Sequence, residues 1–126
     1  MRTAFTLFAP LALAACVTPG AAHSPALEGS AVPLGKAVEV GALVATPEKV
    51  TEDSRCPINA RCIWAGRLIV ETAIEAKDWS ETAQLTLGEP YATHGTTITL
   101  SSGEPGQIAG KPTDPKDYRF TFEGGR

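Results

Sequence analysis

The strongest constraint on the fold is the alternation of apolar and polar side chains over residues 68–75. One set of alternate positions in this segment is mainly apolar and β-branched: Leu68, Val70, Thr72 and Ile74. The positions between them are more polar and include two glutamates. A period of two predicts a β-strand with one buried face, because successive side chains of a strand point to opposite sides of the sheet.

Similar alternation recurs along the chain. It predicts strands over residues 82–87, 97–100 and 118–123, and two earlier strands over 36–40 and 43–46, with Gly41 as a bulge or corner between them. Turn residues separate these runs, and the Pro- and Gly-rich residues 101–115 are expected to form a loop. We therefore predict an all-β fold over residues 34–126, either a small antiparallel sandwich or a partly open barrel of about five to seven strands.

The start of the chain has the layout of a secretory signal. Arg2 supplies a positive charge, residues 4–12 form an apolar run, and small residues precede Cys16. This arrangement resembles the lipobox of bacterial lipoproteins. The resemblance implies that residues 1–15 are a signal peptide and that Cys16 becomes an acylated N-terminus, so that lipid attaches the protein to a membrane.

Residues 16–33 are rich in Ala, Pro, Gly and Ser. We interpret them as a lipidated N-terminus and flexible tether, because such a composition cannot bury enough surface to offset the entropy of ordering. The residue after Cys16 is Val17 and not the aspartate that commonly retains lipoproteins in the inner membrane. The resemblance therefore implies an outer-membrane location facing the periplasm. The alternative is an ordinary cleavage near Gly20-Ala21-Ala22, which would release the chain without lipid.

The charge balance restricts the classes of partner. The chain has 11 Lys and Arg against 14 Asp and Glu, with a net charge of −3 at pH 7. This acidity argues against nucleic acid, whose binding depends on neutralised phosphates, and against a basic patch that docks on anionic lipid. No apolar stretch after the signal approaches the ~20 residues of a membrane-spanning helix, so we expect none in the mature chain.

If Cys16 carries lipid, the remaining two cysteines are Cys56 and Cys62. An even remainder in an exported chain predicts one disulfide, which would remove about 2 kcal/mol of unfolded-state entropy. Metal binding by these thiolates would need two further ligands, and the chain offers only His23 and His94. A redox-active pair usually has two intervening residues, whereas five lie here. We therefore predict no metal and no cofactor.

The residues around this ring form a distinctive block. Residues 53–57 are DSRCP and residues 62–66 are CIWAG. This block resembles a segment of small exported bacterial proteins, many of them lipoproteins, in which four or five residues separate the two parts. The resemblance extends more loosely to a later Thr-Ile-Thr-Leu strand, a Pro- and Gly-rich loop and a final Tyr-x-Phe-x-Phe strand. It indicates shared descent and implies no activity.

We predict that this block is a partner-binding loop, with four candidate contact residues: Arg55, Asn59, Arg61 and Trp64. A loop stiffened by a disulfide and a proline loses little entropy on binding, and Arg and Trp are common at binding hot spots. The alternatives are that the two arginines provide surface charge or bond to loop carbonyls and to Asp53, and that Trp64 covers the core.

Signatures of catalysis are weak, and no catalytic residue is predicted. His94 is expected to be a surface histidine, because nothing marks a nucleophile or carboxylate as its partner. The sequence has no Gly-x-Ser-x-Gly elbow and no phosphate-binding glycine loop. Glu71 and Glu75 are interpreted as solvated carboxylates on one strand face. Trp79 is expected to fold back over the core, with exposure in a hairpin as the alternative.

Together these features predict a lipid-anchored, non-catalytic protein of the cell envelope that acts by binding or scaffolding, with an envelope protein as its partner. An inhibitor or sensor that acts through the Cys56–Cys62 loop is the first alternative. In an inhibitor of proteases, Arg61 would be the residue offered to the enzyme. An enzyme of unknown reaction is the second alternative.

Overall fold

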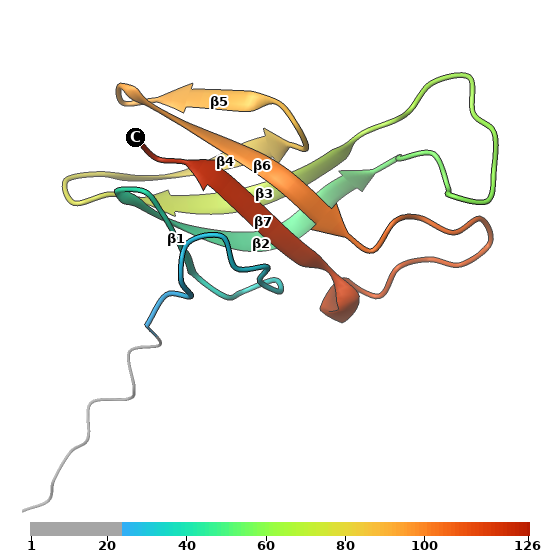
Figure 1. The fold of residues 1–126 in the computed structure, drawn as a ribbon, viewed down its shortest axis with the longest axis horizontal. Helices are drawn as coiled ribbons and strands as arrows, with labels where there is room; N and C mark the ends of the chain where they lie inside the picture. Colours follow the sequence, from blue (N-terminus) through green and yellow to red (C-terminus); the bar gives the residue numbers. More distant parts are fainter. Residues whose placement is uncertain (1–23) are drawn as a thin grey trace, which may run out of the picture.

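The computed structural model describes residues 24–126, so the predictions for Cys16, His23 and residues 1–15 lie outside the described residues. Seven strands form two antiparallel sheets, ordered β1-β2-β3-β4 and β5-β6-β7 (Figure 1). The strands are β1 (Val38–Val40), β2 (Leu43–Asp53), β3 (Leu68–Glu75), β4 (Ser80–Thr86), β5 (Pro90–Thr93), β6 (Thr96–Glu104) and β7 (Arg119–Gly124). A short 3-10 turn, η1 (Pro115–Asp117), precedes β7. The two sheets do not join into a closed barrel, so the predicted antiparallel sandwich is confirmed.

The predicted inward faces are the faces that the structure buries. All four alternate positions of β3 are buried: Leu68, Val70, Thr72 and Ile74. In the second sheet the buried side chains are those of the alternating positions of β6 and β7, together with Tyr118: Ile98, Leu100, Phe120 and Phe122. Each large apolar side chain that is fully buried contributes about 1.5–3 kcal/mol of transfer free energy, so these faces hold the sheets together.

Several strand boundaries differ from prediction, and one strand was not predicted. β6 continues to Glu104, so the expected loop begins at residue 105 and not at residue 101. β2 was expected to end at Thr46 but continues to Asp53, with register shifts between Pro47 and Lys49 and between Val50 and Glu52. These irregularities absorb the residues that break the simple alternation. The edge strand β5 was not predicted, because Pro90 reads as a turn residue and proline is accepted at the start of an edge strand.

The segment before Leu34 belongs to the folded domain from Ala26 onward. Val32 is 2% exposed and exchanges two backbone hydrogen bonds with Phe120, of 2.9 and 2.8 Å. Ala26 accepts a hydrogen bond from the amide of Glu39 and donates one to the carbonyl of Ala37. The prediction of a flexible tether is therefore wrong for these residues. Their composition is poor in apolar side chains, but the open edges of the sandwich supply backbone partners that composition does not reveal.

Two long loops leave the sandwich at the same end. Residues 54–67 connect β2 to β3, and residues 105–118 connect β6 to β7. Figure 1 shows both loops on the right of the molecule, whereas the described chain begins toward the other side. This placement brings the DSRCP and CIWAG block beside the Pro- and Gly-rich loop.

Candidate binding surface on the paired loops

The first loop contains the predicted disulfide. Cys56 and Cys62 are bonded, with their Cα atoms 5.8 Å apart, so the pairing is confirmed. Inside the ring the amide of Ala60 donates a 3.1 Å hydrogen bond to the carbonyl of Pro57, which forms a tight turn. Beyond the ring the amide of Cys56 donates to the carbonyl of Ala65 at 2.9 Å. The ring is thus closed both covalently and by the backbone.

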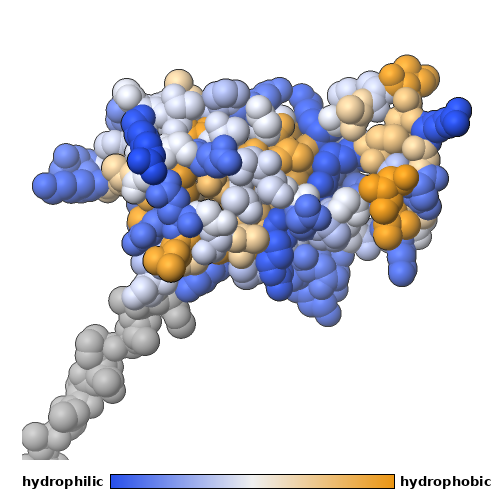
Figure 2. Space-filling view, in the orientation of Figure 1, coloured by the Kyte–Doolittle hydropathy of each residue, from blue (hydrophilic) through white to orange (hydrophobic). Residues whose placement is uncertain are grey.

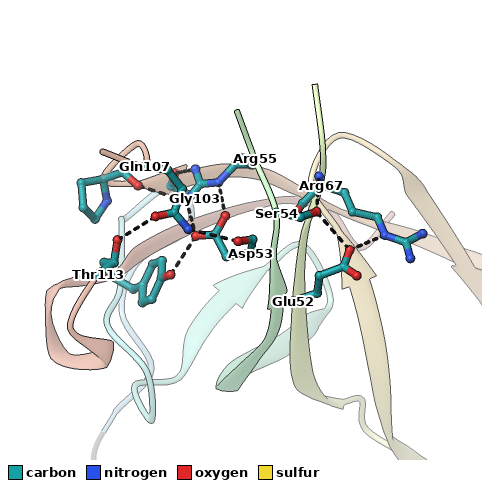
Figure 3. A network of polar contacts seen from close by, with 10 residues as sticks. Glu52, Asp53, Ser54, Arg55, Arg67, Gly103, Gln107 and Thr113 are labelled. Carbon is teal, nitrogen blue, oxygen red and sulfur yellow. Dashed lines mark hydrogen bonds and ion pairs between the residues drawn. The ribbon is translucent and has the colours of Figure 1, made fainter. Parts of the chain in front are cut away.

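The base of this loop is held by a close approach of its two sides. The amide of Ser54 donates to the carbonyl of Arg67 at 2.8 Å, and the amide of Arg67 donates to the hydroxyl of Ser54 at 3.1 Å. Gly66, which directly precedes Arg67, has a φ of +70°, and a Cβ atom there would collide with the carbonyl oxygen of Ser54. Only glycine combines this backbone angle with the missing side chain. Arg67 also pairs with Glu52 (Figure 3).

Arg55 fastens the first loop to the second. Its guanidinium donates two hydrogen bonds to Asp53, of 2.8 and 2.9 Å, and others to the carbonyls of Gly103 at 2.6 Å and Pro105 at 3.0 Å (Figure 3). The side chains of Arg55 and Asp53 are 15% and 6% exposed. Arg55 therefore bonds to Asp53, to a loop carbonyl and to a carbonyl at the end of β6. Bonds to Asp53 and to loop carbonyls were the alternative to partner contact.

Asp53 is the charged centre of this arrangement. Burial acts to raise its pKa, but hydrogen bonds from Arg55 and Tyr118 and the charge of Arg55 outweigh burial, so the pKa lies below its ordinary value. Burial and the bond to Asp53 raise the pKa of Tyr118. At neutral pH the site therefore holds a carboxylate, a guanidinium and a neutral phenol, which are the charge states that these hydrogen bonds need.

The two loops also bond to each other directly. The amide of Ile58 donates to the carbonyl of Gln107, and the amide of Ala109 donates to the side-chain oxygen of Asn59, both at 2.9 Å. The side-chain amide of Gln107 donates to the carbonyl of Asp53 at 3.2 Å. Asn59, a predicted partner contact, is thus engaged in joining the loops. These bonds make the two loops one structural unit.

The outer face of this unit carries clustered apolar side chains. Five large hydrophobic residues are exposed in the described part of the chain, and four belong to these loops: Ile58 at 77%, Ile63 at 107%, Trp64 at 64% and Ile108 at 43%. Figure 2 shows this hydrophobic material at the right-hand end of the molecule. Clustering of this kind marks an interaction surface more often than isolated exposed residues do.

We call this face the tip surface and define it by six exposed residues: Ile58, Arg61, Ile63, Trp64, Ile108 and Lys111. Two of the four predicted contact residues, Arg61 and Trp64, belong to it. Trp64 does not cover the core, which was its alternative role. The isoleucines were not among the predicted contact residues. The disulfide ring is too small to bury Ile58, so the exposure of this side chain could have been predicted from the sequence.

The remaining candidates lie away from the tip surface. Trp79 packs partly against the core, as expected, and its indole stacks on the exposed imidazole of His94 with the ring centres 3.9 Å apart. The imidazole Nδ1 of His94 lies 2.8 Å from the hydroxyl of Thr93. Glu71 pairs with Lys49 at 3.4 Å. These contacts account for the histidine and the glutamate as parts of the sandwich and its surface.

Within residues 24–126, no three side chains of His, Cys, Asp or Glu lie together as a metal site requires. Over the same range, no helix has the length and apolar character needed to cross a membrane.

Comparisons with protein-family models, with curated proteins and with solved structures found no match to this chain. The geometry of the site is therefore the basis for a functional assignment.

Proposed function

We propose that this protein is a lipid-anchored, non-catalytic binding protein of the bacterial cell envelope that engages its partner through the tip surface. The observation that carries this proposal is the exposure of four large apolar side chains on two loops that are fastened to each other. Exposed apolar clusters are unfavourable in water, and a partner that covers them recovers this free energy.

Rigidity of the loops supports binding. The disulfide, the Arg55–Asp53 pair and the hydrogen bond between Ala109 and Asn59 hold the apolar side chains in one arrangement before any partner arrives. A preorganised surface loses less conformational entropy on association than a mobile one. The disulfide therefore has a functional consequence in addition to its effect on stability.

The chemistry of the tip favours binding over catalysis or protease inhibition. The carboxylate of Asp53 is already occupied by Arg55 and by Tyr118, so it is not positioned to exchange protons with a substrate. The hydrogen-bonded turn Pro57–Ala60 directly precedes Arg61. An inhibitor that adds to a protease as a strand would need an extended segment there instead.

The anchor is the lipobox-like sequence that ends at Cys16. One acyl chain holds a protein only marginally, whereas the several chains carried by lipoproteins give lasting attachment. Figure 1 shows the tip loops away from the point at which the described chain begins. An anchor at Cys16 would therefore leave the tip surface accessible.

Site-specific photo-cross-linking in intact cells tests this proposal. A photoreactive amino acid at Ile63 is expected to form adducts with one envelope component, whether protein or lipid. The matched control is the same amino acid at Thr82, an exposed position on β4 that lies outside the tip surface. Equal or absent adducts at the two positions would contradict binding through the tip surface.

A further inference from the structure

We infer that the tip surface inserts into the headgroup region of an anionic lipid bilayer. This inference rests on the proposed function, because it names what the tip surface binds. It is argued from three properties of the loops: the projection of the apolar side chains, the local charge and the position of the single exposed indole.

The apolar side chains project outward individually. Ile63 is 107% exposed and stands clear of its neighbours at a bend of the first loop. Ile58 is 77% exposed, with one methyl group beside Gly106 of the second loop. A protein partner would need a matching cavity for each of them to recover their hydration free energy. A bilayer accepts projecting side chains without such cavities, because acyl chains rearrange around them. Projection of this kind therefore favours lipid.

The local charge of the tip is opposite to that of the whole chain. Residues 55–65 and 105–113 contain no Asp or Glu, although the net charge of the chain is −3. Arg61 and Lys111 are exposed there, and neither takes part in an ion pair among the described residues. Cations beside inserted apolar groups attract anionic headgroups and can keep their charges at the membrane surface.

This local charge changes the conclusion drawn from net charge. The acidic total argued against a basic patch for anionic lipid, but the total averages over both ends of the sandwich. Asp53 is paired with Arg55 inside the loop base, and Asp114 is paired with Lys116. The exposed carboxylates of Glu104 and Asp117 border the tip surface but are not part of it. The only charged residues among the six of the tip surface are therefore the two cations, Arg61 and Lys111.

Trp64 adds the third property. Its side chain is 64% exposed, and the loop that carries it is closed at its base by the bond between Cys56 and Ala65. An indole has an apolar body and a polar N–H group, which suits the boundary between headgroups and acyl chains. With Cys16 acylated, insertion of the tip would be a second attachment and would fix the orientation of the domain on the bilayer.

The test uses Trp64 as its own reporter. The chain has two tryptophans, so Trp79→Phe leaves Trp64 as the only one. The purified protein is added to vesicles of phosphatidylcholine alone and to vesicles with a large share of phosphatidylglycerol. We expect a blue shift of the emission and quenching by brominated lipid in the anionic vesicles, and smaller changes in the neutral ones.

Charge variants provide a quantitative control. Each surface cation contributes about 1 kcal/mol to binding of anionic lipid, so Arg61→Gln with Lys111→Gln is expected to weaken binding roughly 30-fold. Lys49→Gln with Lys77→Gln removes the same charge away from the tip surface and should leave binding nearly unchanged. Equal effects of the two double variants would overturn a contact through the tip surface.

The accessibility of Trp64 to a quencher in solution shows whether its indole enters the bilayer. If iodide in solution quenches Trp64 equally with and without anionic vesicles, the lipid inference is wrong. Adducts between residue 63 and a protein would then still support the proposed function with a protein partner, whereas a lack of adducts would remove both. If Trp79→Phe does not fold, 5-fluorotryptophan in the unaltered chain gives one 19F signal for each tryptophan, and Trp64→Phe assigns them.

Discussion

The hydroxyl of Tyr118 donates a 2.7 Å hydrogen bond to Oδ2 of Asp53, a residue 65 positions earlier in the chain. Asp53 ends β2 in one sheet, and Tyr118 directly precedes β7 in the other. The same carboxylate accepts two hydrogen bonds from Arg55, which directly precedes the disulfide-bonded Cys56. One largely buried carboxylate thus connects the two sheets to the base of the tip surface.

Replacing Asp53 by Asn should destabilise the protein by roughly 2–3 kcal/mol. The substitution removes the charge that compensates the largely buried guanidinium of Arg55, and the loss of one partner of such a pair is costly. Urea unfolding of both proteins measures the difference. Asp114→Asn, in an exposed pair with Lys116, is the matched control and should change stability by less than about 1 kcal/mol. An equally small effect of Asp53→Asn would contradict the role of this carboxylate.

The contribution of Asp53 should disappear in acid. Its pKa in the folded state is lowered, so ionisation favours folding at pH values above the unfolded pKa of about 3.9. This contribution falls as the pH drops through the pKa of the folded state. Thermal melting between pH 2 and pH 7 should therefore show the wild type converging on Asp53→Asn as acidity increases. A gap between the two that is constant with pH would contradict the lowered pKa.

Removing the disulfide should lower stability and also make the arrangement of the tip-surface residues less rigid. Cys56→Ser with Cys62→Ser is expected to cost about 2 kcal/mol, because the unfolded chain regains the entropy that the ring removes. Reductant should lower the melting temperature of the wild type and leave that of the double variant unchanged. A wild type insensitive to reductant would show that the ring adds no stability.

The two tryptophans should respond differently to truncation. Trp64→Ala removes an exposed side chain and should change stability by less than about 0.5 kcal/mol. Trp79→Ala removes packing against the core and the stack with His94, and should cost about 2 kcal/mol or more. Calorimetry of the two variants compares them directly. A large loss for Trp64→Ala would identify its indole as structural and would weaken the proposed binding role.

Lipid attachment at Cys16 can be tested independently of binding by the tip surface. Cys16→Ser should abolish labelling by an alkyne analogue of palmitate and should move the protein out of the membrane fraction, because the acceptor thiol is absent. Cys56→Ser with Cys62→Ser should still be labelled. Unchanged labelling of Cys16→Ser would show that the lipid, if present, is attached elsewhere.

Much of the sandwich could be predicted because strand faces are a local property. Alternation over residues 68–75 identified both the extent of β3 and its buried side. Prediction from local sequence failed where a segment pairs with residues that are distant in the chain. Val32 is buried where its backbone pairs with that of Phe120, and β2 continues past Pro47 because β3 lies alongside with a compensating register shift.

Sequence alone therefore determined the class of the fold, the inner faces of its strands and the closure of the Cys56–Cys62 ring, since each depends on residues close together in the chain. Only the tertiary structure decided which loop residues are available for contact. Arg55 and Arg61 flank the same ring, yet Arg55 is used internally and Arg61 is exposed. The difference arises because the sandwich places carbonyls from the end of β6 and from the loop after it within hydrogen-bond reach of Arg55.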